Sequence, residues 1–337
     1  MRMLLGLTAI TALCMAAPVR AGAGNSSHGV GSSGGGSHGG GHGGGGTGGG
    51  TTNVFYSTVT NDTQLIGDIN YANQLGGTYT IYLQPNTTFT TDGAVIGGAK
   101  TVTLTIIGNG DTFNGPGFGQ YLSRFFVVSA GSSLTLEQLS LQNGCVYANF
   151  GGAIYNSGTL KLSNCTLSGN TSIDRSDYLS ALRGVGGAIY NLGTLVIENS
   201  ILFDNLSTGA NPMGGAIYNA AGTVTVSNCT FTNNSAVDTV LGIDVDPEYP
   251  QSGEGGAICN DGGTVTISHS ILTGNYAAFK GGGICNGGIY NSSGTATVEN
   301  SSTISGNTAD DVQNSGVLYL DGTSTIDILD GNTAISF

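Results

Sequence analysis

Three acidic residues stand at alternate positions in one segment of the sequence: Asp244, Asp246 and Glu248. Carboxylate oxygens are the ligands that Ca²⁺ prefers, and several of them close together along a chain suit its coordination. The segment 237–254 that carries them is an insertion between two repeats, and further insertions fall at 173–185 and 208–213. The spacing therefore predicts a calcium site, with an ordinary solvated acidic loop as the alternative.

Two cysteines, Cys259 and Cys285, occupy the same place in two copies of a repeated motif, GGAIC and GGGIC. If both copies keep register, the two residues lie on adjacent turns of a stacked structure, about 4.8 Å apart. That separation is within the Cα range of a disulfide. The segment 287–291, GGIYN, also fits the motif and gives an alternative register, in which Tyr290 takes the place of Cys285. The first register predicts a disulfide, and the second predicts free thiols.

Three tyrosines, Tyr155, Tyr190 and Tyr218, follow GGAI in three other copies of the motif. Side chains alternate between the two faces of a strand, so a tyrosine next to an inward isoleucine points outward. Stacked tyrosines form an aromatic strip that can bind sugar rings. The alternative is that the stack only stabilises neighbouring turns. The pattern thus predicts a carbohydrate-binding strip, and it predicts that Tyr218→Ser has a mild effect on stability.

The elements that must position these residues are repeats of roughly 22 residues. Successive copies span 151–172, 186–207, 214–236, 255–277 and 282–309. Within each copy apolar and polar residues alternate, which is typical of strands, and Asn and Gly mark the corners. Self-similarity at this period indicates a solenoid. We therefore expect an all-β parallel β-helix with three short strands and three corners per coil, in which Asn156, Asn191, Asn219 and Asn260 form a ladder of amides.

The rest of the chain divides into segments of distinct character. Residues 1–21 combine a positive start with an apolar run too short to span a bilayer, which predicts a signal peptide. Residues 22–52 are almost entirely Gly, Ser, Thr and His, which is typical of a disordered linker. Residues 53–337 are the expected β-helix domain, with regular repeats over about 151–334. A helical pattern at about 62–75 predicts a short N-terminal helix that caps the open end of the β-helix.

The charge of the chain excludes some classes of partner. Only 9% of residues are charged and the formal net charge is −13. Removal of Arg2 and Arg20 with the signal peptide leaves six basic residues against 21 acidic ones, near −15. Affinity for nucleic acid comes from Lys and Arg, so nucleic acid is not expected as a partner. The mature chain has no apolar run long enough for a transmembrane helix. We expect a secreted or cell-surface protein.

The repeats resemble those of the polymorphic outer membrane proteins. Their two motifs, GGAI and a hydrophobic-x-x-Asn sequence, stand here at 151–154 and 167–170 and recur in the following copies. The resemblance covers roughly residues 130–335. It implies a right-handed, pectate-lyase-like β-helix at an outer-membrane or cell surface, adhesin-like, with carbohydrate or a host surface as partner. The family's usual C-terminal translocator barrel has no matching pattern in this chain.

The fold that this resemblance implies also hosts enzymes, so a polysaccharide lyase or hydrolase is the main alternative. Hydrolases need two positioned carboxylates, whereas Lys161, Glu198 and Glu299 are isolated and His269 is a lone exposed residue. We therefore favour a non-catalytic protein. A second alternative comes from outward Thr-x-Thr pairs at 223–225, 264–266 and 295–297, which look like the ice-binding faces of some β-helical antifreeze proteins; residues 159–161 and 194–196 interrupt the array.

Overall fold

The computed structural model describes residues 58–117, 124–147, 150–173, 184–209, 211–237, 253–287 and 293–337. All of them belong to one compact unit. The expected signal peptide, the linker and the acidic triplet Asp244, Asp246 and Glu248 lie outside the described residues. No helix within the described ranges is long and apolar enough to cross a membrane.

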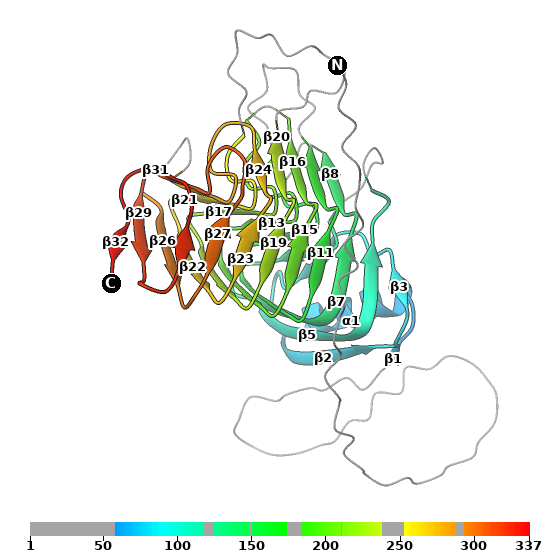
Figure 1. Ribbon diagram of the computed structural model, residues 1–337. Coiled ribbons are helices and arrows are strands. Elements are labelled where there is room, and N and C mark those ends of the chain that lie inside the picture. Colours follow the sequence, from blue (N-terminus) through cyan, green and yellow to red (C-terminus); the bar gives the residue numbers. More distant parts are fainter. Residues whose placement is uncertain are drawn as a thin grey trace, which may run out of the picture. The chain divides into compact units, whose positions relative to one another are not determined.

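The described strands form three sheets in which equivalent strands of successive coils pair in parallel (Figure 1). Sheet A contains β1 (Thr58–Val59), β2 (Gly77–Leu83), β3 (Thr88–Phe89), β5 (Val102–Asn114), β7 (Ser133–Gln142), β10 (Thr159–Ser163), β11 (Thr166–Ser168), β14 (Thr194–Glu198), β15 (Ile201–Phe203), β18 (Thr223–Ser227), β19 (Thr230–Thr232), β22 (Thr264–Ser268), β23 (Ile271–Thr273), β26 (Thr295–Glu299), β27 (Thr303–Ser305), β29 (Val317–Leu320), β30 (Thr325–Ile326) and β32 (Ile335–Ser336). Sheet B contains β4 (Ala94–Ile96), β6 (Phe126–Val128), β9 (Ile154–Asn156), β13 (Ile189–Asn191), β17 (Ile217–Ala220), β21 (Ile258–Asp261), β25 (Ile284–Asn286), β28 (Val312–Asn314) and β31 (Leu329–Gly331). Sheet C contains β8 (Cys145–Tyr147), β12 (Thr171–Ile173), β16 (Leu206–Thr208), β20 (Ser235–Val237) and β24 (Tyr276–Ala277).

A regular coil has four short strands rather than the three predicted. The chain passes through sheet B, then through two strands of sheet A, and then through sheet C. The two sheet A strands of one coil, such as β10 and β11, are separated by a bend at Asn164, whose φ is 53°. Asn tolerates this left-handed conformation better than most residues. Asn199, Asn228 and His269 repeat the bend in later coils, so His269 is a corner residue. The predicted parallel β-helix is confirmed.

Apolar side chains of the successive coils fill one continuous core inside the β-helix. In the first regular coil Ile154, Leu160, Leu162 and Leu167 are fully buried, while Lys161 between them faces outward. The strict alternation along these strands is what the sequence pattern requires.

The two glycines of the GGAI motif are required for two different reasons. The first glycine, such as Gly151, has a positive φ of 70°, which a residue with a side chain rarely adopts. The second glycine, Gly152, has an ordinary φ, but a Cβ there would lie 2.2 Å from the carbonyl oxygen of Gly187 on the next coil. The motif therefore marks a turn where adjacent backbones approach too closely for any side chain.

Two ladders of buried asparagine amides connect the coils. The predicted ladder is confirmed: the Nδ2 group of each residue donates to Oδ1 of the next at 2.7–2.8 Å. Its members are Asn156, Asn191, Asn219, Asn260, Asn286 and Asn314. A second ladder, with bonds of 2.9 Å, runs along the corner between sheets A and C. Its members are Asn170, Asn205, Asn234, Asn275 and Asn307.

A column of small polar side chains lies just after the bend of sheet A. Cys165, Ser200, Cys229, Ser270 and Ser302 follow one another there, all buried. Where a serine comes next in the column, its hydroxyl accepts from the backbone N–H of the residue before it: from Cys165 to Ser200 at 3.0 Å, from Cys229 to Ser270 at 3.1 Å and from Ser270 to Ser302 at 3.2 Å. Serine and cysteine are therefore interchangeable in size at this position, as the repeat suggests.

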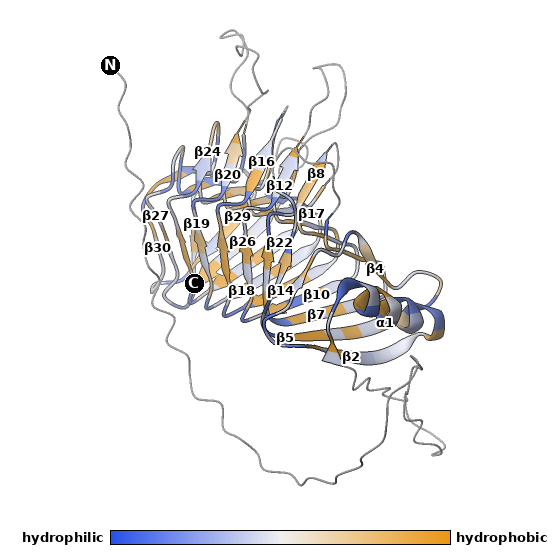
Figure 2. Ribbon diagram, turned by 90° about the vertical axis from the view of Figure 1, so that its right-hand side faces the viewer, coloured by the Kyte–Doolittle hydropathy of each residue, from blue (hydrophilic) through white to orange (hydrophobic). Residues whose placement is uncertain are grey.

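The predicted N-terminal helix is present as α1 (Asp62–Leu75), and Asn61 caps it by accepting a hydrogen bond from the Gln64 N–H. Leu65, Ile69 and Ala72 are buried, and α1 lies against β2, β4 and β5 at one end of the β-helix (Figure 2). Leu75, the last residue of the helix, is 50% exposed. The helix covers apolar core that the first coil would otherwise expose to water.

Removal of one amide from the first ladder is expected to destabilise the protein strongly. Asn219 accepts from Asn191, donates to Asn260 and also donates to the Gly222 carbonyl at 2.9 Å. Asn219→Gly leaves buried polar groups without partners, and we expect a loss of about 2–4 kcal/mol in the free energy of unfolding by urea. The matched control is Asn199→Gly, at an exposed corner with φ 50°, where glycine is well tolerated. Equal losses in the two variants would contradict the role of the ladder.

The column of cysteines and serines predicts a loss of stability at alkaline pH. Burial raises the pKa of the Cys165 and Cys229 thiols to about 11, whereas an unfolded cysteine titrates at about 8.5. Between these values the unfolded chain loses thiol protons that the folded chain retains, so stability falls as the pH rises. Because serine occurs in the same column, the double variant Cys165→Ser, Cys229→Ser should fold. We expect it to remove on the order of 5 kcal/mol of the parent's decline between pH 7.5 and 10.5, measured by urea unfolding. An identical decline in both proteins would contradict this.

Candidate functional site

The predicted tyrosine stack exists on the outer face of sheet B. Tyr155, Tyr190 and Tyr218 are in register on β9, β13 and β17. Their ring centroids are 5.2 and 5.4 Å apart, and the ring planes differ by 9° and 24°. These are the distances and offsets of favourable aromatic pairs. The three tyrosines therefore stack on successive coils, as the repeat predicts.

The strip lies on the outer face, as predicted, but it is only partly open to solvent. Tyr218 is only 6% exposed, and Tyr155 and Tyr190 are half-buried. The chain residue just before each GG pair forms an additional column of parallel bridges that runs over the tyrosines: Phe150, Val185, Met213, Glu254 and Lys280. We call it the cover column. Its apolar members and the tyrosines form a second, smaller core outside the β-helix proper.

Contacts with the rings show how little of their surface is left for a ligand. Phe150 stacks on Tyr190 with centroids 4.8 Å apart. The guanidinium of Arg124 lies 5.3 Å from the centre of the Tyr155 ring, a cation–π distance. Burial lowers the pKa of Arg124. A sugar that stacked on these rings would have to displace such contacts, so the carbohydrate site at the tyrosines stays a prediction that the geometry does not favour.

The two cysteines continue the tyrosine column in the register first predicted. Cys259 pairs with Tyr218 on one side and with Cys285 on the other, and Cys285 pairs with Gln313. The alternative register, with Tyr290 in the column, is therefore wrong; Tyr290 itself lies outside the described residues. Both cysteines are fully buried and the structure holds them as free thiols. A hydrogen bond with Cys285, together with burial, raises the pKa of Cys259. The disulfide between them stays a prediction.

Several polar groups gather around these cysteines in place of the apolar contacts of earlier coils. The Cys285 thiol lies 3.6 Å from a carboxylate oxygen of Glu254 and 3.4 Å from the amide oxygen of Gln313. The hydroxyl of Tyr218 donates to Asp261 at 2.6 Å. We call Glu254, Cys259, Asp261, Cys285 and Gln313 the thiol–carboxylate cluster. Each of its members is buried.

A different outward surface of the β-helix is flat and regular. Two outward positions, two residues apart on β2, β5, β7, β10, β14, β18, β22 and β26, form two parallel columns, which we call the threonine face. One column is Thr78, Thr103, Ser133, Thr159, Thr194, Thr223, Thr264 and Thr295; the other is Thr80, Thr105, Thr135, Lys161, Val196, Thr225, Thr266 and Thr297. These side chains are exposed or half-buried.

The threonine face is longer than the sequence indicated. The pattern in the later coils was evident, but the pairs at 78–80, 103–105 and 133–135 lie in coils without a GGAI motif and were missed. The interruption at Lys161 and Val196 is confirmed, and Lys161 forms an ion pair with Glu198 at 2.9 Å. The face therefore carries hydroxyl groups on both sides of one short gap.

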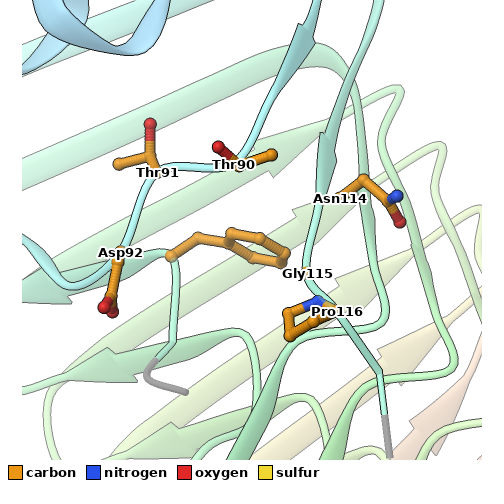
Figure 3. A pocket seen from close by; sticks show the side chains of 7 residues that line it. Thr90, Thr91, Asp92, Asn114, Gly115 and Pro116 are labelled. Carbon is orange, nitrogen blue, oxygen red and sulfur yellow. The ribbon is translucent and has the colours of Figure 1, made fainter. Parts of the chain in front are cut away.

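One pocket lies near the N-terminal end, between the loop after β3 and the end of β5 (Figure 3). Its lining includes Thr90, Thr91, Asp92, Asn114 and Pro116. The side chains of Thr90 and Thr91 are already hydrogen-bonded to Asp62 on α1. Among the described residues of the lining Asp92 is the single carboxylate, whereas glycoside hydrolysis requires a pair of acids.

Comparison with known proteins relates this chain to one protein family. A family model described as "Right handed beta helix region" matches residues 76–302 of the chain. No curated protein and no solved structure matches the chain significantly.

The second core predicts that Tyr218 is a structural residue. Tyr218→Phe removes the hydrogen bond to the buried Asp261 carboxylate, and we expect the free energy of unfolding to fall by about 2 kcal/mol. Tyr155→Phe is the matched control, because that tyrosine is half-buried and no bond from its hydroxyl to a carboxylate occurs among the described residues. Urea unfolding of the two variants measures the difference. A mild effect of Tyr218→Phe, equal to that of the control, would support the prediction from the sequence, in which Tyr218 is an outward residue with little effect on stability.

Proposed function

Because the chain belongs to the right-handed β-helix family, we propose that it is an exported, non-catalytic protein that binds an extended neutral carbohydrate on the threonine face. The observation that carries this proposal is the register of the two threonine columns over successive coils of sheet A. The ligand belongs to a cell surface or to a polysaccharide matrix, in line with the signal peptide predicted from residues 1–21 and with the resemblance of the repeats to those of the polymorphic outer membrane proteins.

The shape of the face favours an extended ligand. Small molecules bind in concave pockets, whereas the strands of sheet A present a regular array. Neighbouring hydroxyls are about 4.8 Å apart along the helix axis and about 6.6 Å apart along a strand. A polymer that itself repeats can make many equal contacts with such an array, and multiple weak contacts add up to useful affinity.

The chemistry of the face favours a neutral carbohydrate. Each threonine offers a hydroxyl that donates and accepts hydrogen bonds and a methyl group that can contact the apolar face of a sugar. The chain has a net charge of −13, which would repel an anionic polysaccharide. The backbone below the face is fixed by the parallel ladders, so binding costs little ordering of the protein.

A second candidate ligand is ice, and the same register of Thr-x-Thr pairs favours it. An ice surface is also flat, uncharged and repetitive. The gap at Lys161 and Val196 places a charged side chain in the middle of the array, which suits a flexible polymer better than a rigid crystal. We therefore prefer the carbohydrate.

The proposal predicts opposite effects of two sets of substitutions. Thr225→Lys with Thr266→Lys introduces a side chain that the same column already accommodates at Lys161, and we expect at least a tenfold loss of binding to insoluble neutral polysaccharides such as cellulose or chitin. Lys161→Thr with Val196→Thr completes the array and should strengthen binding, at the small cost of an exposed ion pair. Sedimentation of the protein with the polysaccharide measures both.

The control is Thr230→Lys with Thr303→Lys, on the outward positions beyond the bend of sheet A. This variant should bind as the parent does. Inhibition of ice recrystallisation, measured on the same proteins, distinguishes the second candidate. If the parent neither sediments with any neutral polysaccharide nor affects ice growth, the threonine face is not a binding surface of either kind.

A further inference from the structure

The tyrosine column and the cover column change character at the same coil. In the preceding coils, aromatic residues of sheet B lie under apolar cover residues such as Val185 and Met213. At the next coil Glu254 replaces the apolar cover residue and Cys259 replaces the tyrosine, and Cys285 follows one coil later. An apolar pair could have continued the second core there. Two columns that change together, to a carboxylate and thiols, indicate a specific use of the site.

The donor atoms at this place are close enough to share one ion. The carboxylate oxygen of Glu254 and the sulfur atoms of Cys259 and Cys285 all lie within 4.8 Å of one another, and the three residues are buried. The Cys285 sulfur and the Glu254 oxygen are 3.6 Å apart. Two ligands at typical zinc distances, about 2.3 Å for sulfur and about 2.0 Å for oxygen, are about 3.5 Å apart in a tetrahedral site. The observed separation is thus that of two ligands of one zinc ion.

A second observation, independent of these three residues, also points to a ligand. Asp261 follows Cys259 by two residues on β21, so both side chains lie on the outer face of sheet B. Its side chain is 8% exposed, and its Oδ1 atom is buried with no hydrogen-bond partner among the described residues. A buried carboxylate oxygen without a partner is costly, and a nearby cation would offset that cost.

We propose that the thiol–carboxylate cluster binds one Zn²⁺ ion through Cys259, Cys285 and Glu254. Two thiolates and a carboxylate are a donor set that zinc accepts, whereas Ca²⁺ and Mg²⁺ prefer oxygen alone. Gln313, whose amide oxygen is 3.4 Å from the Cys285 sulfur, offers a fourth ligand. Asp261 supplies negative charge beside the ion. Binding displaces the two thiol protons to solvent. The ion would link three neighbouring segments, β21, β25 and the bridge residue Glu254.

This site does not depend on the proposed function of the threonine face, which is on another sheet. It does compete with the predicted Cys259–Cys285 disulfide, because the same sulfur atoms cannot serve both. A zinc site and a disulfide therefore give distinct results in one experiment.

The test uses the full chain, purified under reducing conditions and then titrated with Zn²⁺ and with Co²⁺ in its place. We expect one ion per chain, a raised melting temperature by mass action on the folded state, and the near-ultraviolet absorption of thiolate-bound Co²⁺. That absorption separates the site from the histidines of residues 22–52, which contain no sulfur. Cys259→Ser and Cys285→Ser should each abolish the thiolate absorption, and Glu254→Gln should weaken binding by at least tenfold.

The control is the double variant Cys165→Ser, Cys229→Ser, which removes two other buried thiols and should bind the ion as the parent does. Absence of the thiolate absorption from the folded, reduced parent would overturn the proposal without any variant. An absorption that is unchanged in both Cys259→Ser and Cys285→Ser would also overturn it. Non-reducing peptide mapping that finds these two cysteines bridged, in a protein whose reduced form binds no Zn²⁺, would replace the zinc site by the disulfide.

Discussion

The architecture of the described residues depends on one constraint: the strands of each coil hydrogen-bond in parallel to those of the neighbouring coils, in register apart from one shift between β5 and β7. Parallel pairing places identical positions of the repeat directly above one another, about 4.8 Å apart. Any side chain must therefore tolerate its own equivalent as a neighbour. Asparagine satisfies this condition well because its amide both donates and accepts, which explains the two buried ladders. Charged residues satisfy it badly, and they are rare in the chain.

The fold could be predicted in detail because the constraint is visible in the repeat. The inward residues, the corner asparagines and the position of Cys165 with Ser200 all recur at fixed places, so their stacking follows from the period alone. The helix α1 was recognisable from the helical pattern at about 62–75. The extra strand in each coil was not, because the bend at Asn164 shifts the alternation by only one residue, from Leu162 before the bend to Cys165 after it.

The surroundings of the outward residues were much harder to predict. The residue before each GG pair reads as the end of a loop, and only the folded chain shows that Phe150 and Met213 cover the tyrosines. Glu254 likewise reads as one more acid of the insertion 237–254, although it lies beside Cys285, 31 residues further along the chain. An outward-facing residue of a strand is exposed to solvent only where no other segment of the chain covers it. In this β-helix a crossing segment divides the outer surface into a covered part on sheet B and a bare part on sheet A.

The first asparagine ladder also has a consequence for how such a chain can evolve. Its links join residues that are 35, 28, 41, 26 and 28 positions apart, yet the bonds stay within 2.7–2.8 Å. The register between coils is thus indifferent to the number of residues inserted after sheet C. Recombination between two copies of the GGAI segment would join one coil to another in frame, with glycines, corners and ladder positions already aligned. Genes of this kind can gain or lose whole coils in a single event, and the lineage can vary its length and its loops without having to evolve a new core.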